Sequence, residues 1–276
     1  MNIGIVGIGL IGGSYAKALK KYPYKVFGID KNQKTLNYAL KNNIIDVGTS
    51  NPSEVLKDLD VIFLCLYPNE AIKFVRNNIN NFKRDAIISD VAGIKRFMVN
   101  SLGVYFNDDV EFVFAHPIAG KETIGIENSS EDIFHNANFV ITPTTHNKEE
   151  AINLIAILAK QMGFKNISFI SDFQHDEIIS FTSQLTHVIA LSLVNSDEEK
   201  YDTRLFVGDS YKDLTRIAMI NDTLWAELFL KNKDLLLKQI NKFEDQMDIL
   251  KDAITNKDVD KIQELMKSAT QKRRKI

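Results

Sequence analysis

The hydrophobic and polar positions follow one pattern up to about residue 170 and another beyond it. In the first part, short runs rich in β-branched and aromatic residues alternate with segments whose apolar residues recur at helical spacing. The short runs predict strands at Asn2–Val6, Lys25–Ile29, Val61–Cys65, Ala86–Ser89, Val110–Ala115, Asn138–Ile141 and Asn166–Phe169. Helices are predicted after Gly9, after Lys31, after Asn69, after Gly93 and over Lys148–Met162. Since the strands are apolar on both faces, the pattern predicts an α/β domain with a mostly parallel sheet covered by helices.

After Ser171 the helical period dominates, and no further strand is predicted. The expected features are a helix capped by Asp172 and running to about Val194, a turn near Gly208, a helix carrying Lys212 and Arg216, a cap at Asn221–Thr223 and a long amphipathic helix over Leu235–Leu250.

The change of period places a domain boundary near residue 170. It divides the chain into an α/β domain, residues 1–170, and an all-helical domain, residues 171–276. The helical part is too rich in apolar positions to bury them all within itself. We therefore expect it to pack on the first domain and on a second subunit, as a homodimer.

Composition narrows the class of protein. The 276 residues are 45% hydrophobic and 25% charged with a net charge of −2, which is typical of a globular protein and gives no sign of nucleic acid or an anionic membrane as partner. The lone cysteine, Cys65, excludes an internal disulfide and is expected to pack in a strand. With no signal-peptide pattern at Met1–Val6 and no apolar stretch approaching a membrane span, we expect a cytoplasmic protein.

A glycine-rich segment, Gly7-Ile8-Gly9-Leu10-Ile11-Gly12, directly follows the first predicted strand and opens the first predicted helix. In that setting Gly7 allows a tight turn, Gly9 lets the backbone approach a pyrophosphate, and Gly12 lets the helix lie close to the strand. The phosphates would lie at a helix N-terminus, where free N–H groups favour negative charge. The pattern predicts a Rossmann-type dinucleotide site formed by Gly7, Gly9, Leu10, Ile11 and Gly12.

The preference between NAD and NADP is expected to depend on Asp30, which stands eighteen residues beyond Gly12 at the end of the second predicted strand. A carboxylate there accepts hydrogen bonds from the ribose hydroxyls and repels a 2′-phosphate. Lys31 softens that repulsion. The sequence therefore favours NAD as the cofactor.

The candidate catalytic residue is His116, which follows the predicted strand Val110–Ala115 and opens the segment His116-Pro117-Ile118-Ala119-Gly120. In open α/β sheets ligands bind beyond the carboxyl ends of the strands, so His116 is expected beside the nicotinamide. Its imidazole can take a proton from a hydroxyl as hydride leaves the adjoining carbon. Without its wider context, a histidine before a proline is also compatible with a local structural role.

The longer pattern resembles the prephenate dehydrogenase family from Gly7 to about Phe229. The resemblance is carried by His116–Gly120 with Glu122, by His175 and His187 framing Ser183-Gln184-Leu185-Thr186, and by Lys212-Asp213-Leu214-Thr215-Arg216. It implies an NAD-binding Rossmann domain over residues 1–170, followed by a helical dimerisation and substrate-binding domain over residues 171–276. It also implies NAD-dependent oxidative decarboxylation of prephenate to 4-hydroxyphenylpyruvate in tyrosine biosynthesis, with no metal.

The resemblance also implies roles for individual residues. His116 matches the family's catalytic histidine, which accepts the proton of the ring hydroxyl. Arg216 and His187 match residues that hold the two substrate carboxylates. Lys212, one turn before Arg216 on the same predicted helix, would add positive charge, and Glu122 matches a carboxylate that orders or gates the site. A dianionic substrate independently favours arginine with a second donor nearby.

Ser183 is expected in the substrate pocket because it lies four residues before His187 on the same helix face. For other residues a structural role stays open: Lys212 as a solvated surface residue, His175 as a residue of a helix N-terminus, and Arg216 as an ordinary ion-pair partner. Where family members often carry a serine that contacts the substrate hydroxyl, this chain has Gly93. A water or a backbone N–H must then replace that contact, or His116 acts alone.

Other functions remain as alternatives. Arogenate, with an ammonium group, is the rival substrate if Asp209 faces the pocket; as a turn residue beside Gly208 it is more compatible with local backbone contacts, which favours prephenate. A 3-hydroxyacid dehydrogenase of similar layout would need a helical lysine with an asparagine four residues later, which is not found in the appropriate place. A non-catalytic NAD-sensing protein would be supported by the loss of the catalytic base, but His116 is present.

Overall fold

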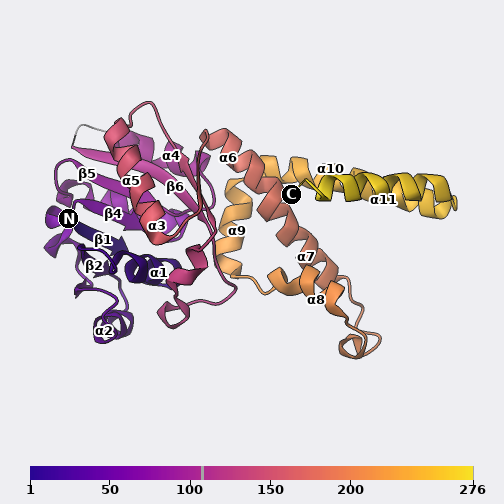
Figure 1. Cartoon of the computed structure of the whole chain (residues 1–276), viewed down its shortest axis with the longest axis horizontal. Coiled ribbons are helices and arrows are strands. Elements are labelled where there is room, and N and C mark those ends of the chain that lie inside the picture. Colours follow the sequence, from indigo (N-terminus) through magenta and orange to yellow (C-terminus); the bar gives the residue numbers. More distant parts are fainter. Residues whose placement is uncertain (107–108, 276) are drawn as a thin grey trace.

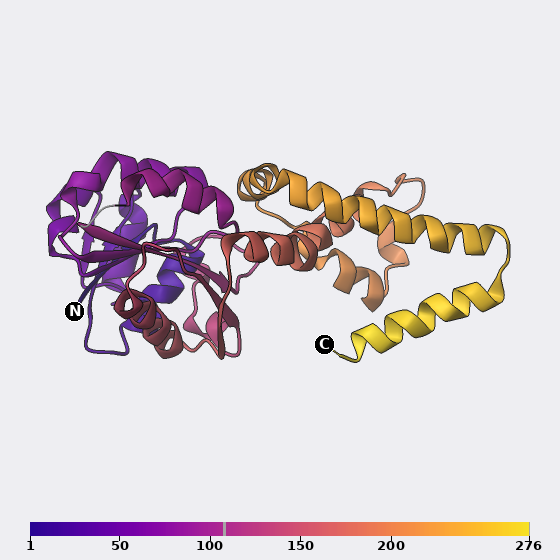
Figure 2. The same ribbon diagram turned by 90° about the horizontal axis from the view of Figure 1, so that it is seen from above.

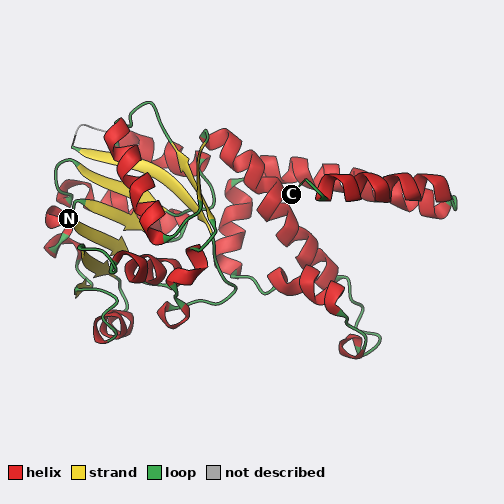
Figure 3. Cartoon of the chain, in the orientation of Figure 1, coloured by secondary structure: helices red, strands yellow, loops and turns green. Residues whose placement is uncertain are grey.

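An eight-stranded sheet fills the N-terminal part of the molecule, and helices extend from it to one side (Figures 1 and 3). The structure is a computed structural model that describes residues 1–106 and 109–275. In chain order the strands are β1 (Asn2–Val6), β2 (Lys25–Ile29), β3 (Val47–Thr49), β4 (Val61–Leu64), β5 (Ala86–Asp90), β6 (Val110–Ile118), β7 (Asn138–Thr142) and β8 (Asn166–Phe169). Their spatial order is β3-β2-β1-β4-β5-β6-β7-β8, and every neighbouring pair is parallel except β6 with β7. The predicted mostly parallel sheet is confirmed.

Two strands differ from the prediction in ways that matter. β3 was not predicted, because three residues are too short a run to show a period. β6 continues to Ile118 and includes His116, which was expected just beyond the strand. The continuation has a physical cause: β6 pairs in parallel with β5 only up to Val113, and its last residues pair antiparallel with β7, where His116 lies opposite Val140.

Helices cover both faces of the sheet, as predicted. They are α1 (Leu10–Leu19), α2 (Gln33–Lys41), α3 (Pro68–Asn78), α4 (Arg96–Leu102) and α5 (Glu149–Met162). Apolar side chains of α1, α2 and α5 form one core, and those of α3 and α4 form the other. Each buried large side chain contributes about 1.5–3 kcal/mol relative to exposure. The two cores hold the strand ends, and hence the residues that follow them, in fixed positions.

The second part is helical throughout the residues that the structure describes (Figure 3). Its helices are α6 (Asp172–Ile179), α7 (Leu185–Asn195), α8 (Asp209–Thr215), α9 (Asp222–Lys231), α10 (Lys233–Thr255) and α11 (Val259–Arg273). α10 and α11 form a long hairpin that extends away from the sheet, and the C-terminus points back toward it (Figure 2).

Two of the predicted helix caps can be compared with the structure. Asn221 caps α9 by accepting a hydrogen bond from the Leu224 N–H at 3.0 Å, as predicted. The cap of α6 is Ser171 and not Asp172: the Ser171 hydroxyl accepts from the Gln174 N–H at 3.2 Å in a capping box. Asp172 is the first helical residue, where its charge favours the helix dipole.

Direct contacts join α9 to the nucleotide-binding part at the start of α3. The Glu227 carboxylate accepts a hydrogen bond from the Asn69 N–H at 2.6 Å, near the N-terminus of α3. The Asn221 amide donates to the Tyr67 hydroxyl at 2.6 Å. Leu228 is buried in the core formed with α3 and α4. The two parts therefore dock through both polar and apolar contacts.

One expectation about membranes needs correction. The continuous helical stretch Asp172–Asn195 is long and apolar enough to cross a membrane, by length and composition alone. An 18-residue window within it has a mean hydropathy of 1.3, and 28% of that window is buried. This stretch was not predicted to be long enough because charged and polar residues interrupt its apolar run. The stretch includes Asp176, which hydrogen-bonds the nucleotide-binding part, so a role inside the folded protein accounts for its N-terminal half.

Candidate active site

The glycine-rich segment forms the turn between β1 and α1 that a dinucleotide needs. Gly7 has φ of +87°, and a side chain there would meet the Cys65 carbonyl oxygen at 2.6 Å. A Cβ on Gly12 would lie 2.0 Å from the Gly7 carbonyl oxygen, so α1 approaches the turn as closely as its backbone allows. At Gly9 there is open space instead. Larger residues are thus excluded where the chain is tight, and room is left where a pyrophosphate would approach.

The start of α1 is suited to an anion. Its N-cap is Gly9, which offers no side-chain hydrogen bond to the first turn, and that turn contains no acidic residue. The leading N–H groups of a helix lack intrahelical partners. Leu10 and Ile11 contribute two of these groups. The site lies where β2 and β4 flank β1 on opposite sides, which is where open α/β sheets bind ligands.

Asp30 follows β2 directly and is tied to the same turn. Its carboxylate accepts hydrogen bonds from the Ile8 N–H and the Asn32 N–H, each at 2.8 Å. It therefore holds the glycine turn against the end of β2, a role that the sequence did not reveal. Carboxylate oxygens have further lone pairs, so the same group can also accept from a ribose hydroxyl.

His116 lies half-buried near the end of β6, at the sheet edge where the strands on either side of the glycine turn also end. Its Nδ1 is 2.8 Å from Nε2 of His175 on α6. The other ring nitrogen, Nε2, makes no hydrogen bond within the part of the chain that the structure describes. The structure thus brings together two histidines that are 59 residues apart, and His175 is a functional candidate rather than only a residue of a helix N-terminus.

His175 in turn contacts Asp176, the next residue. His175 Nδ1 lies 2.7 Å from Asp176 Oδ1, and both side chains are almost completely buried. The Asp176 carboxylate also accepts from the Lys95 N–H at 2.7 Å and the Arg96 N–H at 3.0 Å, at the start of α4. Asp176 therefore joins the helical part to the nucleotide-binding part directly behind His116.

A fully buried ion pair holds the strand that carries His116. Lys95 Nζ donates to Asp90 Oδ2 at 2.6 Å and to the Ala115 carbonyl at 2.5 Å, while Asp90 Oδ1 accepts from the Ala115 N–H at 3.1 Å. Both groups of Ala115 are held, so the backbone just before His116 is fixed from two sides. Removing one partner would strand a buried charge, which typically costs about 3–5 kcal/mol.

The surroundings keep His116 neutral. Burial, followed by the neighbouring His175 and Lys95, holds the pKa of His116 well below its ordinary value. Burial also lowers the pKa of His175, although its hydrogen bond to Asp176 acts in the opposite direction. A neutral imidazole with one unpaired ring nitrogen is what a general base requires at neutral pH.

His187 lies on α7 after an irregular turn. Residues Ser180–Gln184 form a π-helical turn between α6 and α7, a feature that often marks functional sites. Over twelve residues an α-helix would rotate His187 about 120° away from His175. A π-turn rotates less per residue, which turns His187 back toward the face that carries His175.

The ring of His187 contacts its own helix and α9. His187 Nδ1 lies 2.9 Å from the Ser183 carbonyl oxygen, so Ser183 orients the ring through its backbone and not through its hydroxyl. The ring stacks on Trp225 of α9, with centroids 3.6 Å apart. Burial lowers the pKa of His187, and nearby Arg216 lowers it further. Trp225 was not among the predicted site residues.

Glu122 and Arg216 form an ion pair across the two parts of the molecule. Glu122 comes from the segment between β6 and β7, and Arg216 begins a 3₁₀ turn, Arg216–Ala218, directly after α8. Both charges influence His187, so the three residues share one region. Lys212 is exposed on α8. α8 ends at Thr215, and Arg216 keeps right-handed helical dihedral angles as its C-cap, one turn after Lys212.

Gly93 lies beside His116. A Cβ at this position would be 3.6 Å from Nε2 and from Cε1 of His116, and 3.6 Å from Cδ1 of Leu228. These are ordinary van der Waals distances, so the position could carry a small side chain next to the unpaired ring nitrogen. The absence of the family serine is therefore not forced by the surrounding structure.

Cys65 lies just past β4 and is half-buried, slightly more accessible than expected. Burial, followed by the charge of Asp90, raises the pKa of its thiol. The thiolate is disfavoured, which agrees with the prediction that Cys65 packs and does not act as a nucleophile.

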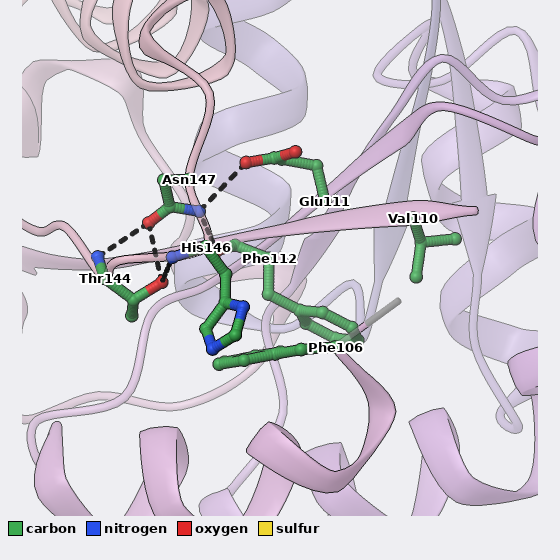
Figure 4. A pocket seen from close by; sticks show the side chains of 7 residues that line it. All are labelled: Phe106, Val110, Glu111, Phe112, Thr144, His146 and Asn147. Atoms are coloured by element: carbon green, nitrogen blue, oxygen red, sulfur yellow. Dashed lines mark hydrogen bonds between the residues drawn. The ribbon is translucent and has the colours of Figure 1, made fainter. Parts of the chain in front are cut away.

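A cavity of about 120 Å³ lies at the opposite end of β6 from His116 (Figure 4). Its polar groups largely bond one another: the Asn147 amide donates to Glu111 at 3.1 Å and to the Phe112 carbonyl at 2.7 Å, and the His146 ring lies against Phe106. It contains none of the predicted site residues.

Asp176 and Trp225 were not predicted as site residues, for different reasons. Asp176 is an acidic residue in a helix, and only its burial and its bonds to Lys95 and Arg96 distinguish it. Trp225 is the lone tryptophan, a signal that was present but carried no position relative to His187. The segment His175-Asp176 could have been noticed as a histidine followed by a carboxylate.

A glycine turn opening a parallel sheet, with a neutral histidine at the same sheet edge, defines a nucleotide-dependent oxidoreductase. Comparison with known sequences makes this specific. The sequence model described as "Prephenate dehydrogenase, nucleotide-binding domain" matches residues 15–168, and that described as "Prephenate dehydrogenase, dimerization domain" matches residues 171–268. The chain belongs to the prephenate dehydrogenase family.

Individual relatives agree over nearly the whole chain. The cyclohexadienyl dehydrogenase of Zymomonas mobilis is 30% identical over 280 residues, covering 99% of this chain and 94% of that protein. The prephenate dehydrogenase of Bacillus subtilis is 27% identical, covering 96% of this chain and 73% of that protein.

Solved structures give the same result. The prephenate dehydrogenase of Aquifex aeolicus, in complex with hydroxyphenyl propionate and NAD+, has a TM-score of 0.91 at 28% identity, covering 100% of this chain and 98% of that one. Synechocystis arogenate dehydrogenase has a TM-score of 0.85 at 25% identity, covering 100% and 99%. A 3-hydroxyisobutyrate dehydrogenase of Mycobacterium tuberculosis, with a TM-score of 0.55 at 13% identity, shares the fold.

Proposed function

We propose that this protein catalyses the NAD-dependent oxidative decarboxylation of prephenate to 4-hydroxyphenylpyruvate, a step of tyrosine biosynthesis. The observation that carries the proposal is the neutral His116, half-buried at the sheet edge, with Nδ1 engaged by His175 and Nε2 unpaired. Family membership supplies the reaction, and this geometry supplies its base.

His116 Nε2 takes the proton of the substrate's ring hydroxyl: the O–H bond breaks and an N–H bond forms. The carbon bearing that hydroxyl loses hydride, for which bound NAD supplies the acceptor. When the ring carboxylate leaves as carbon dioxide, its bonding electron pair enters the ring, which becomes aromatic as the ring oxygen regains a proton. The low pKa of His116 keeps its Nε2 unprotonated through the neutral pH range.

The NAD site is formed by Gly7, Gly9, Leu10, Ile11 and Gly12, with Asp30 at the ribose. The fit rests on the open space at Gly9 and on the uncapped first turn of α1. Asp30 repels a 2′-phosphate, which favours NAD over NADP.

Arg216 and His187 hold the substrate carboxylates, with Glu122, Lys212 and Ser183 around them. Because the Ser183 carbonyl oxygen engages Nδ1 of His187, its Nε2 donates to a carboxylate when the ring is protonated. Since Arg216 pairs with Glu122 in this structure, a substrate carboxylate would have to displace Glu122 or share the guanidinium with it. Arginine suits that exchange because its planar fork can bind two carboxylate oxygens in parallel. Glu122 thereby acts as the internal counter-ion that the substrate replaces.

Prephenate is favoured over arogenate because the groups gathered near His187 include a guanidinium, and Lys212 is close in sequence. Asp209 does not provide a clear ammonium site: it is exposed in the first turn of α8, where its charge favours the helix dipole.

The assembly is a homodimer. The division into domains, a separate point, falls at residue 170. The match to a dimerization domain supports the first point, as do the exposed apolar side chains of the helical part, which include Phe181, Tyr201, Leu205, Phe206, Leu214, Met219 and Leu230. Exposed apolar surface on this part would be covered by a second subunit. The end of β8 at Phe169 and the start of α6 at Asp172 support the boundary. The single half-buried thiol accords with a cytoplasmic location.

The test is an absorbance assay of NADH formation with purified protein, with prephenate and arogenate measured side by side and NAD and NADP as alternative oxidants. We expect the largest kcat/KM for prephenate with NAD. A clear preference for arogenate would overturn the substrate assignment, and no NADH with either substrate would overturn the function.

A further inference from the structure

The hydrogen bonds behind His116 fix where its proton lies. Asp176 accepts only from donors: the Lys95 N–H, the Arg96 N–H and the ring of His175. A carboxylate in this position requires a proton on His175 Nδ1. The other nitrogen of a neutral His175, Nε2, is then an acceptor. It faces His116 Nδ1 at 2.8 Å, so the proton of His116 must lie on Nδ1.

We infer that His175 and Asp176, both supplied by α6 of the helical part, are positioning residues that fix the tautomer and orientation of His116 so that its bare Nε2 faces the substrate. The inference rests on the proposed function, in which His116 is the base. It goes beyond that function because it makes the base dependent on the docking of the two parts: the nucleotide-binding part carries His116, and the helical part determines which of its nitrogens is free.

The chemistry needs no proton to move along this chain of side chains. When His116 Nε2 gains the substrate proton, Nδ1–H continues to donate to His175 Nε2, and the positive charge is stabilised through His175 by Asp176. The same logic operates where a carboxylate orients a catalytic histidine through a hydrogen bond. Here a second histidine stands between the carboxylate and the base.

Within the described residues, four charged or titratable groups lie in the contacts that surround His116. His175 and Asp176 come from α6, Asp90 ends β5, and Lys95 lies just before α4. Lys95 is paired with Asp90 and bonded to Ala115, so it fixes the strand while Asp176 acts on the ring. Removing the Asp176 charge should make the protonated form of His116 less stable, because Lys95 then acts with less opposition.

The first test needs no substrate. The chain contains five histidines, so ring nitrogen NMR of histidine-labelled protein, with His116→Asn to assign the signal, can report the tautomer. We expect His116 protonated at Nδ1 and bare at Nε2. A proton on Nε2 would overturn the inference, whatever substrate the enzyme uses.

The second test compares variants by kcat and by the pH dependence of kcat/KM. His175→Gln keeps an acceptor near the position of Nε2, whereas His175→Leu removes it. We expect the leucine variant to lose kcat on the order of 10²-fold or more and the glutamine variant to retain at least tenfold more of it. Equal losses in the two variants would overturn the inference.

The third test isolates the charge. Asp176→Asn should lower kcat and move the acid limb of kcat/KM to lower pH, because His116 becomes a weaker base. The matched control is Glu227→Gln, which also removes a carboxylate that caps a helix of the other part, here α3, but lies outside the His116 contacts. The control should leave the acid limb in place. An unmoved limb in Asp176→Asn would reduce Asp176 to a docking residue and overturn its role.

If neither prephenate nor arogenate is oxidised by the unmodified protein, the proposed function fails while the tautomer measurement still decides the inference. The two failures are therefore distinguishable.

Discussion

The nucleotide-binding part and the helical part of this molecule encode their functional residues in different ways. In the first, the glycine turn and His116 are placed by local sequence, at the ends of strands whose positions are fixed by two apolar cores. In the second, the relevant residues depend on contacts distant in sequence: His175 with His116, Arg216 with Glu122, and His187 with Trp225. In the proposed mechanism the first part supplies the base and the cofactor site, and the second supplies the substrate's surroundings and the orientation of the base.

The largest expected effect concerns the nucleotide-binding part, which carries the proposed base. His116→Asn should lower kcat by about 10²–10⁴-fold, the usual range for loss of a general base. The Kd for NAD should hardly change, because His116 lies outside the glycine turn. Steady-state kinetics together with a cofactor titration measure both quantities. A variant that keeps near-normal kcat across neutral pH would remove His116 from the mechanism.

Arg216→Ala tests the helical part, which is proposed to surround the substrate. This variant should mainly raise the KM for prephenate. Loss of a charged hydrogen-bond donor typically costs about 1.5–3 kcal/mol, or about 10- to 150-fold. The control is Lys212→Ala, which removes a nearby positive charge that is exposed on α8. If both variants raise KM equally, recognition rests on the general field of the pocket and not on the guanidinium.

These two predictions rest on residues that the sequence singled out, whereas other features of the structure left no sign in the sequence. Strands β1, β2 and β8 were predicted with their observed bounds because β runs and turn glycines act locally. The π-turn at Ser180–Gln184 was not, since a single added residue in a helix leaves no periodic trace. Nor was the 3₁₀ turn Arg216–Ala218 that directly follows α8. Long-range contacts decide such irregularities.

The role of Asp176 could not be predicted for the same reason. Its three partners come from a neighbouring histidine and from backbone groups 80 and 81 residues away. The sequence pattern shows which face of a helix is apolar, but it does not show which groups of another domain contact that helix. Asp30 shows the limit even within the first part: its position was correct, but its hydrogen bond to the Ile8 N–H depends on how the turn folds back.

Asp30→Ser should give a smaller effect, confined to the cofactor. Loss of the carboxylate relieves the repulsion of a 2′-phosphate and should narrow the gap between NAD and NADP in kcat/KM. It also removes the hydrogen bond to the Ile8 N–H, so NAD itself should bind more weakly. The KM for prephenate at saturating NAD should stay the same. If the unmodified enzyme used NADP as well as NAD, the role of Asp30 in cofactor choice would be wrong.

The smallest expected effect comes from Gly93, where the two parts meet beside the base. Gly93→Ser places a hydroxyl near His116 Nε2, at a position where a Cβ makes only ordinary contacts with His116 and Leu228. A hydroxyl there can hold the substrate's ring hydroxyl in line with Nε2. A neutral hydrogen bond contributes about 0.5–1.5 kcal/mol, which corresponds to about a 2- to 12-fold rise in kcat/KM. Gly93→Ala is the matched control, since it adds the Cβ without the hydroxyl. Serine should exceed alanine in kcat/KM while the two have the same thermal stability. If serine is no better than alanine, the orientation of the substrate hydroxyl is already complete in the natural enzyme, and the bond between His116 and His175 is sufficient to align the base.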